Sequence, residues 1–563
     1  NGWDEVNNLK DISHLEGTPR MTRRDSIVFP GIVTQSYWDA PTTGVSANYS
    51  VNPGDELQMK ISISYTSIEN ARLNMETEAP QWDFEKHKNE SLAIWNNELG
   101  KIKVKGGSFD QRTKFYTDLW HVLLGRHKTN DVSGDYPDYT QGERYGNFTK
   151  AKLKVRKLPM NPDGTARFNM YSFDALWLTQ WNLNILWGLA WPEILDDFSA
   201  SLVQQADNGG LLPRGAIAGG YSYIMTGTPA SNMIVSTYMK DLMTKTDPQH
   251  AFAVTKRNHM PGGMMGDTKE ELSFYIKNGY SPDNAGKTLE WAFQDWSLAQ
   301  MAKKMGKQRD YNYFSKRSQG WTKLFDPEVN LILPKDRKGN WLHKDPLSNV
   351  GWVEANSWQA TWSVSHGIPE LSKLMKGNDQ LSTMLNHAFE KSEPEDFVYG
   401  YGSGYISYAN QPGCSNAHVF NHVGKPWLSQ YWVRKVNEQA YGGVTPDLGY
   451  GGHDEDQGQM GGVSALMSLG LFSLDGNNSV NPRYELTSPV FDEIKIKLNR
   501  DYYEGEEFRI TVANNSEENV YIQGATLNNS ELNTYWFSHD AFQKGGDLKL
   551  ILGPRPNKEW GVE

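Results

Sequence analysis

Near the start of the chain, apolar and polar residues alternate. Every second position from 57 to 65 is apolar, the period of a strand with one buried face. Residues 31–52 are turn-rich and leave room for further strands and loops. We therefore predict an N-terminal β region over residues 1–81. So short a β region needs a partner, which is either the C-terminal part of the chain or a segment outside it. The alternating residues are Leu57, Met59, Ile61, Ile63 and Tyr65.

From about Trp82 the period becomes helical. A linker over residues 82–107 holds a short amphipathic run and a brief strand at 102–104. Helical segments then follow one another with few strand signals, which predicts a toroid of helical hairpins over residues 108–481. Its loops at one end carry the chemistry. The predicted helices are 111–124, 175–189, 193–206, 231–244, 289–305, 311–324, 357–375, 380–392, 420–436 and 456–472.

After Pro482 the period returns to two. Ile494, Ile496 and Leu498 alternate with lysines, and three more short apolar runs follow between turn residues. The pattern predicts a small antiparallel β domain over residues 482–563. The fold class is therefore multidomain α+β, with a helical toroid flanked by an N-terminal β remnant and a C-terminal antiparallel sheet.

Composition and charge narrow the function classes. The chain has 563 residues with a net charge of -11 and a mean hydropathy of -0.64, which argues against a nucleic-acid partner and a membrane span. Its start, Asn-Gly-Trp-Asp-Glu, looks processed or truncated. The 20 Trp, 27 Tyr and 21 Phe residues suit a sugar, which has apolar C–H faces and a polar rim. Large helical barrels also use Trp to fill the core.

Three consecutive acids form the strongest chemical signal. Asp454, Glu455 and Asp456 lie between a glycine-rich loop and an apolar helix, so their negative charge falls at a helix N-terminus. Such a cluster needs a cation, hydrogen bonds or a shared proton. Taken alone, the cluster is either a solvated acidic cap or part of an active site.

Several segments resemble one known family, the glycoside hydrolase family 92 α-mannosidases. They include residues 61–72, 115–121 and 288–296, the segment Val353-Glu-Ala-Asn-Ser-Trp-Gln, the acid-rich residues 454–460, and residues 488–492 and 553–557. The resemblance runs in colinear order over about 500 residues. It implies an (α/α)6 barrel preceded by a β-sandwich, of which this chain holds only a remnant. It also implies secretion or a periplasmic location, because the substrates of the family are glycans.

The resemblance assigns roles at the catalytic end. Glycoside hydrolysis needs one carboxyl as acid and a second as base or nucleophile. Glu354, between Trp352 and Trp358, takes the position of the family acid, and aromatic surroundings raise a carboxyl pKa as an acid requires. Ala355 replaces a family glycine beside it. Asn356 and Gln359 are expected to bind the sugar or orient Glu354, and Trp352 and Trp358 to contact the sugar.

The base is predicted within the acid cluster. By alignment with the family, Asp456 is the base and Asp454 its partner, while Glu455 faces away. His453 beside them is a further expected sugar contact. The family inverts configuration, so the acid and the base are expected about 6.5–9.5 Å apart.

The family uses Ca²⁺, and the resemblance places that ion at Asn410, with the carbonyl of Ala409. Here the sequence departs from the family, because Gln411 stands where the family has Glu and Gly413-Cys-Ser415 replaces a histidine-containing run. Gln411 is kept as a predicted sugar contact. A second departure lies in residues 171–179, where the sugar-binding aspartate of the family motif Trp-Asp-Thr is displaced to Asp174.

Three functions follow. The first is an inverting, exo-acting, Ca²⁺-assisted α-mannosidase acting on terminal α-linked mannose of a glycan. The second is a glycosidase of the same fold for another sugar, because the mannose-binding motifs are altered. The third is a carbohydrate-binding relative without turnover.

Overall fold

A computed structural model describes residues 52–140, 153–446, 448 and 455–562. The chain divides into two compact units, Asn1–Ile61 and Ser62–Glu563. In the described part of the first unit, Asn52 and Asp55 close a turn through a backbone hydrogen bond of 3.1 Å.

The predicted strand at residues 57–65 is wrong. These residues form no strand, and the five apolar side chains that suggested it are at least 44% exposed. Alternating residues form a strand only where a neighbouring strand hydrogen-bonds to their backbone N–H and C=O groups. No described strand pairs with this segment.

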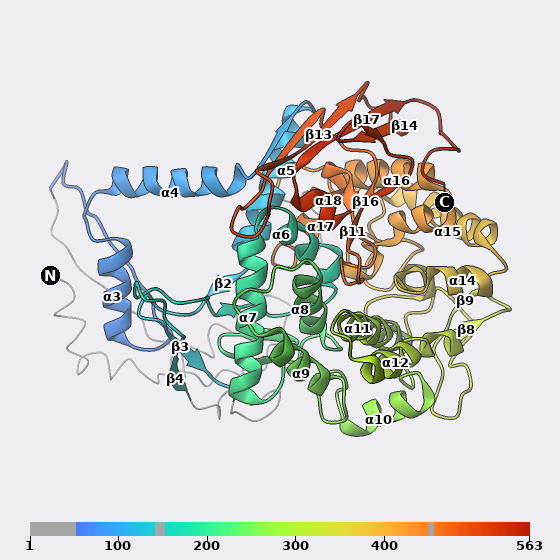
Figure 1. Ribbon diagram of the computed structural model, residues 1–563, viewed down its shortest axis with the longest axis horizontal. Helices are drawn as coiled ribbons and strands as arrows, with labels where there is room; N and C mark the ends of the chain where they lie inside the picture. Colours follow the sequence, from blue (N-terminus) through green and yellow to red (C-terminus); the bar gives the residue numbers. More distant parts are fainter. Residues whose placement is uncertain (1–51, 141–152, 447, 449–454, 563) are drawn as a thin grey trace. The chain divides into compact units, whose positions relative to one another are not determined.

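The second unit is mainly helical up to residue 470. α11 packs against both α8 and α12, and α5 packs against α17 although their sequences are far apart (Figure 1). The helices are α3 (Ile68–Glu78), α4 (Phe84–Leu99), α5 (Phe109–Leu124), α6 (Leu183–Ala190), α7 (Pro192–Gly209), α8 (Pro229–Met239), α9 (Pro248–Asn258), α10 (Lys269–Asn278), α11 (Ala285–Lys304), α12 (Gln308–Arg317), α13 (Ser357–Ala360), α14 (Ile368–Leu374), α15 (Asn378–Ser392), α16 (Pro426–Gln439), α17 (Gln459–Leu469) and α18 (His539–Gln543).

Several helix predictions need correction. The helix expected over 420–436 is a 3₁₀ turn, η7 (Asn416–Val423), followed by α16, which begins at Pro426. The helix expected over 357–375 is broken into α13 and α14, because Pro369 lacks the N–H that a continuous helix needs and instead lies in the first turn of α14. The sequence pattern also missed α9 and α10, as well as α3 inside the predicted β region 1–81 and the short α18 inside the C-terminal β region. The core of the helical part is rich in tryptophan, and the fully buried set is Trp181, Trp187, Trp191, Trp291, Trp321 and Trp362. For these six residues, core filling is the role that the structure supports.

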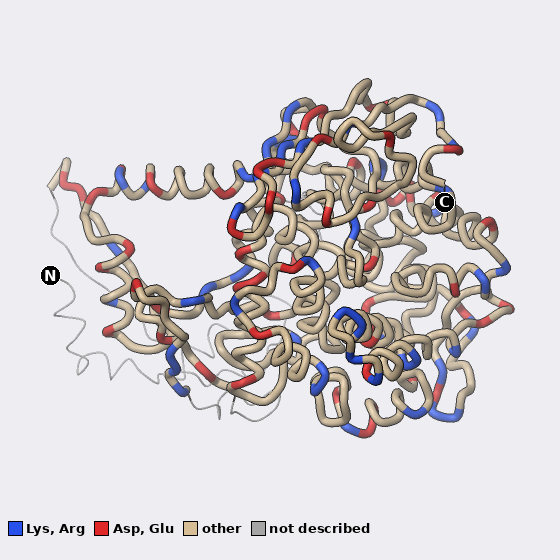
Figure 2. The backbone as a smooth tube through the Cα atoms, viewed as in Figure 1, with Lys and Arg blue, Asp and Glu red and all other residues tan. Residues whose placement is uncertain are grey.

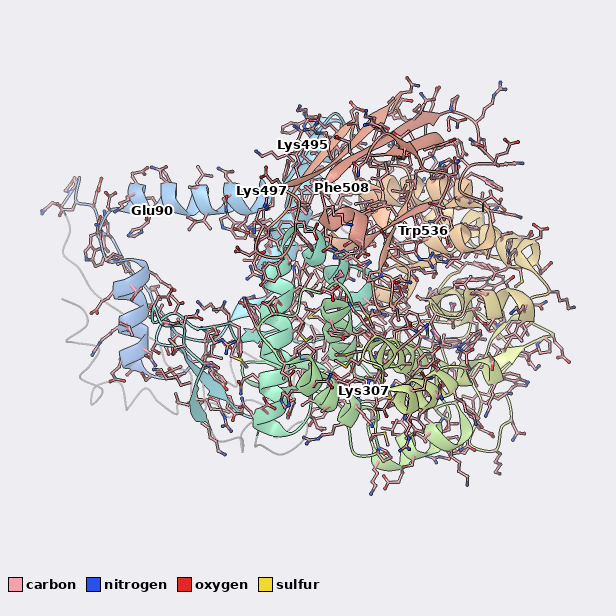
Figure 3. All side chains as sticks on the ribbon, in the orientation of Figure 1. Glu90, Lys307, Lys495, Lys497, Phe508 and Trp536 are labelled. Atoms are coloured by element: carbon pink, nitrogen blue, oxygen red, sulfur yellow. The ribbon has the colours of Figure 1, made fainter. Side chains whose placement is uncertain are left out.

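The C-terminal part forms a six-stranded sheet in the order β1-β12-β13-β17-β14-β15. β1 (Ile102–Lys105) comes from before the helical part and pairs antiparallel with β12 (Glu493–Lys497), with Ile102 opposite Ile496. The sheet is not wholly antiparallel, since β13 (Glu507–Ala513) and β17 (Gly546–Gly553) run parallel. In β12 the isoleucines are buried, while Lys495 and Lys497 project from the other face (Figure 3).

The remaining strands are short. β14 (Tyr521–Leu527) and β15 (Ser530–Glu531) complete the sheet, and β10 (Leu471–Phe472), β11 (Arg483–Leu486) and β16 (Trp536–Ser538) form a second one. Four two-stranded pairs lie among the helices: β2 (His127–Lys128) with β5 (Tyr171–Ser172), β3 (Asp135–Asp138) with β4 (Lys154–Lys157), β6 (Gly215–Ile217) with β7 (Gly220–Ser222), and β8 (Phe325–Asp326) with β9 (Leu331–Ile332). The α+β fold class is confirmed, whereas the four-part division of the chain stays a prediction.

Charges of both signs are mixed along the described chain (Figure 2). None of the described helices combines the length and the hydropathy that a bilayer-spanning segment needs.

Candidate active site

Two consecutive residues connect the predicted acid to the predicted base. Asn410 Nδ2 donates to Glu354 Oε2 at 2.9 Å. The next side chain, Gln411, donates through Nε2 to Oδ2 of Asp456. Both amides lie at the start of a 3₁₀ turn, η6 (Gln411–Gly413), which Asn410 caps by accepting the N–H of Gln411 at 3.0 Å. Residues from three separate loops therefore meet here.

The backbone at these carboxylates is strained. Glu354 has a φ of 48°, Asp456 of 56° and Gln457 of 56°, in the left-handed region that non-glycine residues seldom adopt. Each such residue costs about 1–3 kcal/mol, and residues of this kind cluster at functional sites. The loop of Asp456 also passes close to α5, because a Cβ on Gly125 would lie 1.9 Å from the carbonyl oxygen of Gln457. Gly125 thus permits the position of this loop.

The described residues of the acid cluster, Glu455 and Asp456, make different contacts. Glu455 accepts the backbone N–H groups of Gly458 at 2.8 Å and Gly461 at 3.2 Å, and it lies 3.3 Å from His121. Glu455 is therefore the N-terminal acceptor of α17. The interpretation as an acidic cap is right for Glu455, whereas Asp456 points to Gln411. The predicted residues His453 and Asp454 lie outside the described residues.

Asn356 and Gln359 hold a loop in place. Asn356 Nδ2 donates to the carbonyls of Gly402 at 3.0 Å and Gly404 at 2.8 Å, and Gln359 Nε2 donates to that of Ser403. Asn356 Oδ1 also accepts the N–H of Gln359 at 3.1 Å and so caps α13. Both amide groups thus fix residues 402–404. Of these, Gly402 lines a small hollow together with Glu354, Tyr399 and Tyr401.

The two tryptophans that flank Glu354 in sequence lie differently. Trp352 is 8% exposed, and its indole N–H has no hydrogen-bond partner in the described structure. The ring of Trp358 lies against Tyr405, at 5.2 Å between ring centroids, and against His387 at 6.3 Å. Trp358 on α13 is thus part of an aromatic cluster with His387 on α15 and Tyr405 in a loop.

Asp174 lies at the acid loop, because its backbone N–H donates to Gln457 Oε1 at 3.1 Å. In the family motif the aspartate follows tryptophan directly, and here Leu178 follows Trp177. Leu178 has a φ of 58° and is buried. A leucine therefore occupies a backbone conformation that favours Asn, Asp or Gly.

The oxygen atoms near Asn410 are of the chemical type that a hard cation binds. Gln411 Oε1 is buried and accepts no hydrogen bond from a described residue. Together with Asn410 Oδ1, the buried Ala409 backbone and the Asp456 carboxylate, it provides the all-oxygen set that Ca²⁺ prefers. Among the described residues no three His, Cys, Asp or Glu side chains form a metal group. A cation here would therefore rest largely on neutral oxygens. Behind Asn410, Cys414 is buried, and its Sγ donates to the carbonyl of Asn410 at 3.7 Å.

Sequence reasoning missed Glu290. This carboxyl on α11 is 7% exposed and lines a cavity with Val353 and Ala355, the two neighbours of Glu354. Burial raises its pKa to about 8. The available signal was an acid in the middle of the buried face of a helix.

Comparison with known proteins shows the family of the chain. Residues 70–554 match the model of the glycosyl hydrolase family 92 catalytic domain. A protein of Arthroderma benhamiae described as an uncharacterized secreted glycosidase is 23% identical over 560 residues, which cover 91% of this chain and 62% of that protein. The chain thus spans about three fifths of the length of this relative.

Two solved structures from Bacteroides thetaiotaomicron have the same fold. One is a family 92 α-mannosidase, with a TM-score of 0.77, 24% identity, and coverage of 89% of this chain and 63% of the other. The second is a family 92 inverting mannosidase, with a TM-score of 0.75, 26% identity, and coverage of 89% and 67%. Since the family model covers most of the chain, this protein belongs to glycosyl hydrolase family 92.

Proposed function

We propose that this protein is an inverting, exo-acting α-mannosidase that removes terminal α-linked mannose from glycans. The observation that supports the proposal best is the connection of Glu354 and Asp456 to the adjacent residues Asn410 and Gln411, in a chain of family 92. In this proposal Glu354 protonates the leaving oxygen, and Asp456, with Asp454, activates water.

The amide donors suit these roles. A hydrogen bond from Asn410 fixes one oxygen of Glu354 and leaves the other free to face the leaving group. The donor on Gln411 fixes one oxygen of Asp456 in the same way, so the other can face the attacking water. The strained backbone at both carboxylates holds them in fixed directions without rearrangement during the reaction.

The proposal also covers a bound Ca²⁺ ion, the side chains that contact the sugar and the cellular location of the protein. Asn410, Ala409, Gln411 and Asp456 would hold the ion, which when bound supplies positive charge for sugar hydroxyls. Sugar contacts are assigned to Trp352, Asn356, Trp358, Gln359, Asp174, Gln411 and His453. The relative in Arthroderma benhamiae is named as secreted, which supports a secreted or periplasmic location here.

Aryl α-mannosides with good and poor leaving groups test the acid. Glu354→Gln is expected to lower kcat/KM by about 10³-fold for methylumbelliferyl or alkyl mannosides, and much less for 2,4-dinitrophenyl mannoside, which needs no protonation. Proton NMR of the first product is expected to show β-mannose. Equal losses on all leaving groups, or α-mannose as first product, would contradict the mechanism.

One observation favours a second candidate, a glycosidase of the same fold for another sugar. Gln411 and Cys414 stand where the family motif has ionisable residues, and the sugar-binding aspartate of that motif is displaced to Asp174. A screen of aryl α- and β-glycosides separates the two candidates, because the first requires that the α-mannoside be the best substrate.

A further inference from the structure

A small cavity adjoins the backbone that carries the candidate acid. Its wall includes Val353 and Ala355 on either side of Glu354, and Pro412, which follows Gln411. The cavity volume is about 40 Å³, enough for about three water-sized groups. It is therefore too small for a sugar ring, although a substituent on a ring held near Glu354 fits.

The other walls are mostly aromatic and aliphatic. Trp177, Leu178, Leu289 and Phe293 line the cavity. Three polar side chains share this lining, Gln180, Ser363 and Glu290. Gln180 already accepts a hydrogen bond from Asn232 Nδ2 at 3.3 Å, and Ser363 Oγ donates to the carbonyl of Ala360 at 2.7 Å. Of the described residues that line the cavity, only Glu290 is ionisable.

Both oxygens of Glu290 are fixed in direction. Trp177 Nε1 donates to Oε2 at 3.1 Å, and Gln294 Nε2 donates to Oε1 at 2.8 Å. Gln294 is itself held, because its Oε1 accepts the N–H of Thr228 at 2.9 Å. The carboxyl is therefore rigidly placed at the cavity wall, which is what selective recognition of a small polar group requires.

We propose that Glu290 binds the exocyclic hydroxymethyl group of the terminal sugar and so selects hexoses. The inference rests on the proposed function. Of the substituents on a pyranose, the hydroxymethyl group extends farthest from the ring, and it has one polar atom on a short apolar stem. The cavity matches it with one fixed carboxyl on a wall that is mostly aromatic and aliphatic. Sugars that carry a group on this hydroxyl, or lack it, are poor substrates.

The protonation state agrees with this assignment. Burial raises the pKa of Glu290 to about 8, so the neutral acid can donate a hydrogen bond to the hydroxyl at pH 7. The charged groups that act on it are Arg214 and Asp267, which pair with each other at 2.7 Å. Among the residues that the structure describes, no other ionisable side chain lines the cavity. Recognition of the hydroxyl is therefore expected to change as pH rises through about 8.

A substrate pair that differs by one oxygen tests the inference. The probes are 4-nitrophenyl α-D-mannopyranoside and its 6-deoxy analogue, assayed with wild type, Glu290→Gln, Glu290→Leu and the control Ser297→Ala. Ser297 is buried on the same helix and lies outside the cavity lining. Wild type and control are expected to prefer the mannoside by about 10- to 100-fold in kcat/KM, and Glu290→Leu by less than about 3-fold.

The pH profile adds a measurement that a merely structural role would not change. In wild type the preference for the mannoside is expected to shift between pH 7 and 9, and in Glu290→Gln it should stay constant. Glu290→Gln keeps the shape of the side chain and one acceptor oxygen for either Trp177 or Gln294, so it covers the case in which the leucine variant does not fold. Given that wild type hydrolyses the mannoside, two results would show that the inference is wrong. One is a preference for the mannoside that is the same in wild type and Glu290→Leu, and the other is a wild-type preference that does not change with pH. If wild type hydrolyses neither probe, the proposed function fails first.

Discussion

Gln411 donates its side-chain N–H to the carboxylate of Asp456. Its neighbour Asn410 donates to Glu354 at 2.9 Å, so a change at this turn acts on both predicted catalytic groups. The turn depends on close packing, since a Cβ on Gly413 would lie 1.8 Å from the carbonyl oxygen of Ser407.

Gln411→Glu puts a second carboxylate against Asp456. Without divalent cations we expect a lower melting temperature than wild type, because like charges meet in a partly buried site. Added Ca²⁺ should raise the melting temperature of the variant more than that of wild type, and calorimetry should show tighter binding. Gln411→Met, which lacks charge, serves as the control. Equal responses of all three proteins to Ca²⁺ would argue against a cation at this turn.

Asp456→Asn removes the proposed base. Because water must be activated whatever the leaving group, we expect a loss of about 10³-fold or more in kcat on every aryl mannoside. The contrast with Glu354→Gln, whose loss depends on the leaving group, separates base from acid. Steady-state rates of both variants on aryl mannosides with three different leaving groups measure this contrast. A loss for Asp456→Asn that follows leaving-group pKa would reverse the two assignments.

Glu290 makes the stability of the protein depend on pH. Its pKa rises on folding from 4.5 to about 8, through burial, so between these values the native state holds a proton that the unfolded chain has lost. Stability from this group is therefore complete at low pH and falls as pH rises toward about 8. Between pH 5.5 and 7.5, wild type should lose about 2–3 kcal/mol relative to Glu290→Gln. Urea unfolding at both pH values measures the difference, and a constant difference would show that Glu290 ionises normally.

Lys240, at the end of α8, makes the stability of the protein change with pH in the opposite direction. It is 1% exposed and donates to the carbonyl of Asn184 at 2.7 Å, and burial lowers its pKa from 10.5 to about 7. Above pH 7 the unfolded chain binds the extra proton, so wild type gains stability as pH rises from about 7 toward 10.5.

Lys240→Met removes this dependence. We expect the variant to gain most over wild type at pH 7, and the gain to shrink by about 2 kcal/mol by pH 9. Denaturant midpoints at the two pH values provide the test, with the exposed Lys338→Met as control. A gain that is the same at both pH values would contradict the prediction.

Local pattern determined much of this protein. The helical period predicted the long helices, such as α7 and α11, and the alternation of isoleucine and lysine predicted β12, because both periods follow from backbone geometry alone. The strand at 57–65 failed because a strand also needs a partner, which alternation cannot supply. The parallel pairing of β13 with β17 likewise joins segments far apart in sequence.

The family motifs in the sequence indicated Glu354, Asp456 and Asn410 as site residues, and those motifs are local too. Only the tertiary structure showed that Asn410 binds Glu354 and that Gln411 binds Asp456. It also showed that Glu455 caps α17 and that Glu290 lies beside the loop of Glu354. The hydrogen bonds of Glu354 and Asp456 join residues 56 and 45 positions apart, and Trp177 lies 113 positions from Glu290. No short window of sequence contains such contacts, or the burial that shifts a pKa.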